Sequence, residues 1–311
     1  MPFSIDEEIA KELAPVMEQM AAVLPRQAGD WETLRALLDG LFTHAGTLFP
    51  PINGIDIERY TVQTADDSEL VLSWFTKVGQ QPGSAALYIH GGGYISGSVE
   101  HYAPAIRRYV ADSGVPILAV DYRLAPEHQY PTPVEDCYAA LKWLTANAKR
   151  LGVEPSRIAV MGDSAGGGLA VGTAALVRDR GELELAAQIL IYPMLSSRTT
   201  ISDPNIAPFL TWTHDDNVDA WKAFLGEEAH PYFTFPDSPN PVDLPPAYIE
   251  VGELDGFRDE CVEYGQRLRR HAISAEVIVR QGCPHAFELI APDADVSLRA
   301  FADRSRRLAA L

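Results

Sequence analysis

From residue 85 onward, short apolar runs alternate with longer amphipathic segments, and this alternation limits the folds open to the chain. The apolar runs have the length of buried strands, and the segments between them place apolar residues at helical spacing. Strands are expected at 85–89, 116–121, 158–161, 187–192, 247–252 and 275–280. Helices are expected at 102–112, 134–149, 169–180, 258–271 and 293–308. Strands separated by helices predict an α/β fold, with a mostly parallel sheet that carries helices on both faces.

Two segments alternate in the strand manner before this pattern begins, at 55–62 and 70–77, around a turn-prone run. We therefore expect a hairpin at an antiparallel edge of the sheet. Earlier still, one helix is expected after a capping-box match of Ser4 with Glu7, and a second one starts at Asp30. Because these helices precede every strand, they are either packing helices or a cap over a site.

The alternation is interrupted once, between residues 195 and 240, by a segment rich in Pro, Asp, Ser and aromatic residues. A long interruption between two strands is typical of an insertion that forms a lid or a binding loop. We therefore expect one main domain with a cap made of two parts. The expected boundaries are 1–50 for the N-terminal cap helices, 51–194 for the first part of the main domain, 195–240 for the cap insertion and 241–311 for the second part.

The composition argues against several classes of partner. The chain has 311 residues and a formal net charge of −18, which repels phosphate backbones and anionic membrane surfaces. The first residues lack the basic start and apolar run of a signal peptide, and no stretch has the apolar length of a bilayer span. Cys137, Cys261 and Cys283 have neither paired nor metal-type spacing. We expect a cytoplasmic protein with reduced thiols, no metal, no nucleic acid partner and no membrane partner.

A serine lies where the strand at 158–161 passes into the next helix. The sequence there is G-D-S-A-G at residues 162–166, and its two glycines lack the Cβ atoms that would clash in a sharp turn. Such a turn pushes the Ser164 hydroxyl beyond the sheet edge, as in the nucleophile elbow of lipases and esterases. An H-G-G-G run at residues 90–93, directly after a strand, is the loop that accompanies this elbow. Ser164 is therefore the candidate nucleophile.

A serine nucleophile needs a histidine base, which in turn needs a carboxylate to hold it. In α/β hydrolases the acid and then the histidine follow the serine along the chain. His214 and His230 fall in the insertion, and His271 ends a helix, where a cation suits the helix dipole. His285 directly follows a strand, at the sheet edge where α/β proteins carry their sites. His285 is therefore the candidate base.

The acid should also lie on a loop after a strand. Asp255 follows the strand at 247–252, whereas Asp259 and Glu260 fall in the first turn of the next helix, where carboxylates are favoured without any catalytic role. Asp255 is the candidate acid, and Asp259 is the alternative. The oxyanion of the reaction needs preorganised donors, which the Ala165 N–H and the glycine loop can supply. The spacing leaves open which glycines donate.

Three motifs together resemble the hormone-sensitive lipase family of α/β-hydrolase carboxylesterases, in the branch with the G-D-S-A-G elbow. They are H-G-G-G-Y at 90–94, Y-R-L-A-P-E at 122–127 and G-D-S-A-G-G at 162–167. The resemblance runs from residue 85 to the C-terminus and implies the α/β-hydrolase fold, with a cap made of the N-terminal helices and the insertion. The triad that it implies is Ser164, Asp255 and His285. The oxyanion donors that it implies are Gly92, Gly93 and Ala165.

Two departures from the family pattern lie next to this triad. The chain has D-G-F at 255–257 where members usually carry D-P-L, and H-A-F at 285–287 where they usually carry H-G-F. Both departures leave the reactive residue in place and concern the shape of the loop.

Other side chains around the motifs have structural interpretations. His90 is expected to pin the glycine loop, and Asp163 to make a structural hydrogen bond while pointing away from the site. The residues expected to form a buried polar network under the loop are Tyr122, Arg123 and Glu127. The candidate substrate-pocket residues are Tyr94, Phe209 and Trp212, although the cap aromatics equally suit the core of the cap.

The sequence thus predicts a serine carboxylesterase that hydrolyses short- to medium-chain acyl esters through an acyl-enzyme on Ser164, without a cofactor. An amidase, a lactonase or a lipase on the same triad is an alternative, and so is a non-catalytic ligand receptor on the same fold. The plant gibberellin receptors of this family have lost the catalytic histidine, whereas His285 is present here. Relatives also imply a homodimer formed through the last strand, 275–280.

Overall fold

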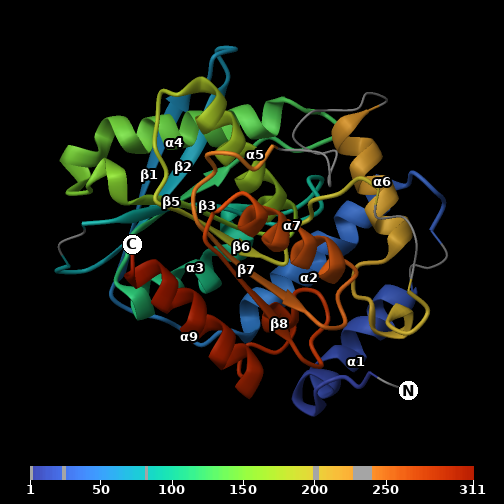
Figure 1. Ribbon diagram of the computed structural model, residues 1–311. Helices are drawn as coiled ribbons and strands as arrows, with labels where there is room; N and C mark the ends of the chain where they lie inside the picture. Colours follow the sequence, from blue (N-terminus) through green and yellow to red (C-terminus); the bar gives the residue numbers. More distant parts are fainter. Residues whose placement is uncertain (1–2, 23–25, 81–82, 199–202, 227–239) are drawn as a thin grey trace.

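The computed structural model describes residues 3–22, 26–80, 83–198, 203–226 and 240–311. His230 and the last part of the cap insertion therefore lie outside the described residues. Within them, eight strands form one sheet in the order β1-β2-β4-β3-β5-β6-β7-β8 (Figure 1). The strands are β1 (Ile55–Gln63), β2 (Glu69–Lys77), β3 (Ala85–Ile89), β4 (Ile117–Asp121), β5 (Ile158–Asp163), β6 (Ala187–Ile191), β7 (Ala247–Gly252) and β8 (Ala275–Arg280).

The pairing of the strands confirms the expected α/β fold. β1 pairs with β2 and β2 with β4 in antiparallel fashion, so the predicted hairpin forms one edge of the sheet. From β4 onward every neighbouring pair is parallel. The carboxyl ends of β5, β7 and β8 therefore lie at the same edge of the sheet, which brings together the loops that follow them.

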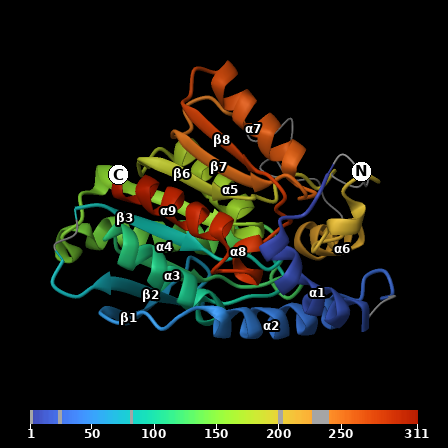
Figure 2. The ribbon, with the colours of Figure 1, turned by 90° about the horizontal axis from the view of Figure 1, so that it is seen from below.

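Helices cover both faces of the sheet (Figures 1 and 2). α3 packs against α9 on one side, and α4 packs against α5 on the other. The helices are α1 (Glu7–Ala22), α2 (Trp31–Leu48), α3 (Val99–Ser113), α4 (Thr132–Leu151), α5 (Ala165–Arg180), α6 (His214–Leu225), α7 (Arg258–Arg270), α8 (Phe287–Ile290) and α9 (Asp295–Ala309). Two 3₁₀ turns are η1 (Pro155–Arg157) and η2 (Ala207–Phe209).

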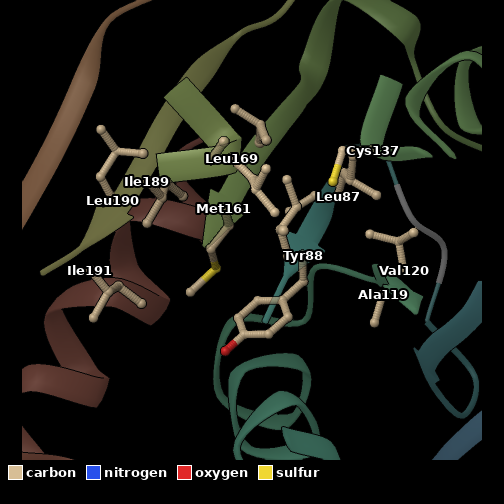
Figure 3. Close-up of a cluster of buried hydrophobic side chains, with 14 of the residues drawn as sticks. Leu87, Tyr88, Ala119, Val120, Cys137, Met161, Leu169, Ile189, Leu190 and Ile191 are labelled. Carbon is tan, nitrogen blue, oxygen red and sulfur yellow. The ribbon is translucent and has the colours of Figure 1, made fainter. Parts of the chain in front are cut away.

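The core lies around the central strands, as expected for parallel strands covered on both faces. Every residue of β3 and β5 is buried. Figure 3 shows Leu87 of β3 on the same side of the sheet as Leu169 of α5, whereas Tyr88 of β3 and Met161 of β5, which lie opposite each other in the register, point to the other side. Burying one such side chain stabilises the fold by about 1.5–3 kcal/mol, so this packing holds the central strands and their covering helices together.

The start of α1 differs from the expectation based on Ser4. The Asp6 carboxylate accepts hydrogen bonds from the backbone N–H groups of Glu8 (3.0 Å) and Ile9 (3.3 Å), and the helix begins at Glu7. Asp6 therefore caps this helix, because its side chain is closer to the first free N–H groups than that of Ser4. The second expected start is confirmed, since Asp30 accepts from the backbone N–H of Thr33.

The N-terminal helices and the insertion meet at one end of the molecule, where α1, α2 and α6 lie close together (Figure 2). α6 was not expected from the sequence, and a capping box between Thr213 and Asp216 begins it. The Arg26 guanidinium, which precedes α2, lies 2.8 Å from Asp216 and 3.2 Å from Asp219 on α6. These nearly buried ion pairs tie the two segments to each other.

No helix in the part of the chain that the structure describes has the length and apolar character needed to cross a membrane. The same residues contain no group of three or more histidine, cysteine or acidic side chains placed to hold a metal ion.

Candidate active site

Ser164 occupies the sharp turn between β5 and α5. Its backbone lies at φ 53° and ψ −120°, a conformation that side-chain-bearing residues rarely adopt. The turn is tight because a Cβ on Gly166 would lie 2.0 Å from the carbonyl oxygen of Ile89. Glycine is therefore required for α5 to approach β3, and this approach holds the Ser164 side chain at the sheet edge.

Three side chains from separate loops converge at this edge. His285 Nε2 lies 2.9 Å from Ser164 Oγ, and His285 Nδ1 lies 2.7 Å from Asp255 Oδ2. All three side chains are buried. The other carboxylate oxygen of Asp255 accepts from the backbone N–H of Phe257 at 2.8 Å, which fixes its orientation. The alternative acid, Asp259, instead forms an ion pair with its neighbour Arg258 and is exposed.

The loop that carries His285 has an unusual backbone. Ala286, the next residue, lies at φ 56° and ψ 30°, in the left-handed region that glycine adopts with less strain. This is the position at which the resembled family usually carries glycine. The imidazole itself packs between Tyr192 and Phe257, whose ring centroids lie 4.6 and 5.2 Å away, both in edge-on arrangements.

A buried ionic cluster lies behind Tyr192. The Tyr192 hydroxyl donates to Glu288 Oε1 at 2.6 Å, and the Arg304 guanidinium donates to the same oxygen at 2.7 Å. Arg304 also donates to Glu250 Oε1, and both Arg304 and Glu250 are fully buried. Removing one partner of such a cluster leaves an uncompensated charge in a low-dielectric interior. The cluster therefore ties β7, α8 and α9 together beneath the histidine loop.

The glycine loop, residues 90–93, borders the same site as the triad. Gly92 and Gly93 line the same pocket as Ser164 and His285. A Cβ on Gly93 would lie 2.5 Å from the Trp212 ring, so the indole packs directly on this loop. His90 is buried and stacks on Tyr122 with ring centroids 4.3 Å apart. Ala165, the third residue implied as an oxyanion donor, is the first residue of α5.

The polar network expected beneath the loop is only partly present. Tyr122 donates its hydroxyl to the carbonyl oxygen of His90 at 2.9 Å, as a support for the loop would. Arg123 instead pairs with Asp136 and Asp66, away from the glycines. Glu127 is half-exposed and pairs with Arg35. Arg123 and Glu127 differ from the expectation because they form ion pairs elsewhere. Arg123 pairs with Asp136 of α4 and with Asp66 of the β1–β2 turn, and Glu127 pairs with Arg35 of α2.

Asp163 precedes the elbow serine and is almost completely buried. Its Oδ1 accepts a hydrogen bond of 2.6 Å from the Tyr88 hydroxyl, in agreement with the expected structural bond. Burial, reinforced by the negative charge of Glu288, raises the pKa of Asp163 to about 7. Asp163 nevertheless lies in the lining of the pocket, which differs from the expectation that it points away from the site.

The pocket that opens onto Ser164 has a volume of about 100 Å³. Its walls come from α1, α2, the cap insertion and α8, and most of them are apolar. The apolar lining side chains are Val16, Met20, Leu38, Leu41, Phe42, Ala45, Leu48, Trp212, Leu289 and Ile290. Of the two interpretations of the N-terminal helices, the structure supports the cap. No local pattern in the sequence indicates which apolar side chains of α2 line the pocket.

Two of the three residues expected in the pocket lie outside this lining. Tyr94 is fully buried, stacks on Phe224 with centroids 4.0 Å apart, and donates its hydroxyl to the carbonyl oxygen of Met194. Phe209 packs against the small apolar cluster that contains Leu254. Trp212 alone of the three lines the pocket, together with Thr211, which sequence reasoning missed.

Comparison with known proteins identifies relatives of this chain. A family profile described as alpha/beta hydrolase fold matches residues 86–289. The chain is 37% identical over 224 residues to carboxylesterase NlhH of Mycobacterium tuberculosis, a match that covers 67% of this chain and 68% of that protein. Among solved structures, a bacterial heroin esterase superposes with a TM-score of 0.86 at 32% identity, covering 99% of this chain and 98% of the other.

A hyperthermophilic esterase from the archaeon Pyrobaculum calidifontis superposes with a TM-score of 0.85 at 28% identity, covering 99% of each chain. The similarity therefore extends over both the sheet and the cap. The chain belongs to the α/β-hydrolase fold family, within its hormone-sensitive lipase-like branch of carboxylesterases.

Proposed function

We propose that this protein is a serine carboxylesterase whose triad is Ser164, His285 and Asp255. The observation that carries the proposal is the continuous contact from Ser164 Oγ to His285 Nε2 at 2.9 Å and from Nδ1 to Asp255 at 2.7 Å. A serine so placed loses its proton as it attacks, because the base is already within hydrogen-bonding distance. The esterases among its relatives support ester hydrolysis as the reaction.

The reaction follows from this arrangement. Ser164 Oγ attacks the ester carbonyl carbon while His285 Nε2 takes the hydroxyl proton, and Asp255 stabilises the resulting imidazolium. The tetrahedral oxyanion accepts hydrogen bonds from the backbone N–H groups of Gly92, Gly93 and Ala165. Collapse of this intermediate expels the alcohol, which receives the proton from His285. A water molecule, deprotonated by the same imidazole, then hydrolyses the acyl-enzyme and restores Ser164.

The pocket supports short- to medium-chain, apolar acyl esters as substrates. Its volume of about 100 Å³ is smaller than the ~150 Å³ of an apolar cavity that holds benzene. Its lining is apolar around the reacting groups, which favours hydrocarbon chains over charged substituents. A long-chain lipase substrate would need the walls from α2 and α8 to separate.

The test is hydrolysis of p-nitrophenyl esters of graded acyl length by the wild-type protein and by Ser164→Ala. We expect turnover with short and medium chains, and a loss of at least about 10³-fold in kcat in the variant, because the nucleophile is absent. A thermal melt shared by both proteins shows that the variant is folded. Ester turnover retained by Ser164→Ala would contradict the proposal.

A fluorophosphonate probe separates an esterase from a receptor on the same fold. An adduct on Ser164, measured by intact mass, is expected of the esterase, because phosphonylation uses the same activated hydroxyl. Absence of an adduct, combined with absence of ester turnover, would favour a non-catalytic receptor.

We also propose a cytoplasmic location and a homodimer formed through β8. Cys137, Cys261 and Cys283 are free and buried, which suits a reducing compartment. β8 is the last strand in the sheet order, and its Val279 side chain is 39% exposed. An edge strand with an exposed apolar side chain offers unpaired backbone groups to a second copy.

A further inference from the structure

One short stretch of the cap insertion, Ile206–Trp212, contacts three loops of the proposed site, namely those that carry Asp255, Gly93 and His285. Leu210 and Ile206 pack with Leu254, the residue directly before Asp255. Trp212 covers Gly93 of the glycine loop. We call this stretch the bridging segment.

The third contact of the bridging segment is a hydrogen bond to the histidine loop. The Thr211 hydroxyl donates to the backbone carbonyl oxygen of His285, with an Oγ1–O distance of 2.8 Å. This carbonyl belongs to the peptide that joins His285 to Ala286. Ala286 has a φ of 56°, which lies in the strained left-handed region. A strained residue keeps its conformation only where its surroundings hold it.

We propose that Thr211 is a positioning residue, whose hydroxyl holds the His285 peptide and thereby keeps the imidazole in line with Ser164 Oγ. This inference rests on the proposed esterase function. Rotation of the 285–286 peptide would move the imidazole relative to two partners at once, since His285 contacts both Ser164 and Asp255. The role is distinct from a contact with substrate, although Thr211 also lines the pocket.

The hydrogen bond from Thr211 to the His285 carbonyl connects the cap insertion to the catalytic base. Thr211 is followed by Trp212 and by Thr213, the N-cap of α6, and α6 is in turn paired with Arg26 before α2. The position of the cap insertion thus sets the position of the catalytic base.

The test compares Thr211→Val with Thr211→Ser. Valine keeps the size of the side chain and removes the hydroxyl, whereas serine keeps the hydroxyl and removes the methyl group. For Thr211→Val we expect a loss of kcat of about tenfold with KM changed by less than about twofold, because misalignment of a catalytic group slows the chemical step more than binding. Thr211→Ser is expected to recover most of this loss.

Two further readouts separate positioning from a change in pocket shape. The loss of kcat in Thr211→Val should be the same for acetyl, butyryl and hexanoyl esters, and the rate of phosphonylation by a small fluorophosphonate should fall by a similar factor. Thr145→Val is the matched control, since Thr145 Oγ1 also donates to a backbone carbonyl, that of Leu141, on α4, which contributes no residue to the pocket lining. It should keep wild-type rates.

Wild-type kcat in Thr211→Val would overturn the inference, and so would a loss that depends on acyl length or appears only in KM. If Thr211→Val fails to fold, as judged by its thermal melt, Thr211→Ala is judged by the same criteria. Failure of the wild-type protein to hydrolyse any ester would contradict the proposed function itself. The two failures are therefore distinguishable.

Discussion

Asp163 lies next to the proposed nucleophile without belonging to the triad. It is enclosed by charged and titratable groups from four elements. These are Tyr88 on β3, Tyr102 on α3, Glu288 on α8 and Arg304 on α9. Tyr88 and Arg304 favour its charged form, but burial and Glu288 outweigh them, and the pKa rises from its ordinary 3.8 to about 7. Near neutral pH, a large share of this carboxyl is therefore protonated in the folded protein.

The raised pKa of Asp163 predicts a pH-dependent penalty on stability. Because the folded pKa lies above the unfolded value, the stabilising contribution of the proton is complete below about pH 4 and is lost as the pH rises toward 7. At pH 8 the buried charge costs up to about 4 kcal/mol, from roughly three pKa units at 1.36 kcal/mol each. Asp163→Asn cannot ionise and can still accept from Tyr88, so it should avoid this penalty.

Urea unfolding of the wild type and of Asp163→Asn at pH 5 and pH 8 measures how the free energy of unfolding of each protein changes with pH. The free energy of unfolding of the wild type should fall relative to that of Asp163→Asn between these two values of pH. Parallel behaviour of the two proteins would show that the Asp163 carboxyl titrates near its ordinary range.

The site residues that can be predicted from the sequence are those whose position follows from the topology of the sheet. Asp255 and His285 each follow a strand of a parallel sheet, so their loops had to meet at one edge. Tyr94 belongs to another class, because its positive φ of 65° and its stacking on Phe224 of α6 turn the ring away from the pocket. Thr211 likewise depends on where the insertion crosses the histidine loop, which no local pattern in the sequence records.

Among the elements, α2 contributes more apolar side chains to the pocket wall than any other described element. Phe42 lies in this wall and packs against Tyr102, with ring centroids 5.3 Å apart. Replacing Phe42 with alanine removes the ring from a cavity of only about 100 Å³. The ratio of kcat/KM for an octanoyl ester to that for a butyryl ester should rise by roughly tenfold, because the vacated space would bury about two of the additional methylenes, each contributing about 0.8 kcal/mol.

Steady-state kinetics with the two p-nitrophenyl esters measures this ratio. Trp31→Ala is the control, because Trp31 starts the same helix but does not line the pocket. An unchanged acyl-length profile in Phe42→Ala would mean that the acyl chain does not lie along α2.

The presence of a helix or strand was easier to predict from the sequence than the part that it plays in the folded protein. The strands of the central sheet have apolar runs that match their burial, and they were found within a few residues of their observed bounds. α9 looked like an ordinary amphipathic helix, yet it delivers Arg304 into the interior, where Glu250 and Glu288 balance its charge. An arginine in such a pattern normally faces solvent, so only the assembled partners reveal that it is buried.

At the scale of the whole molecule, the two edges of the sheet differ. One edge is the β1–β2 hairpin, and the other is β8, which runs parallel to β7 and leaves its outer side unpaired by any described strand. Two copies that join through β8 by two-fold symmetry would extend the sheet across the interface and cover Val279. The strand is short, with bounds Ala275–Arg280, so the flanking helices would have to share the contact.

Val279→Lys tests this arrangement, because a two-fold axis near the strand centre would bring two added lysines close together. We expect the wild type to sediment as a dimer at micromolar concentration and Val279→Lys to sediment as a monomer, since like charges at a paired edge repel each other. Val78→Lys is the matched control, because Val78 is 62% exposed and follows β2 at the other side of the sheet. A wild-type protein that stays monomeric across this range, or a dimer that Val279→Lys leaves intact, would exclude β8 as the interface.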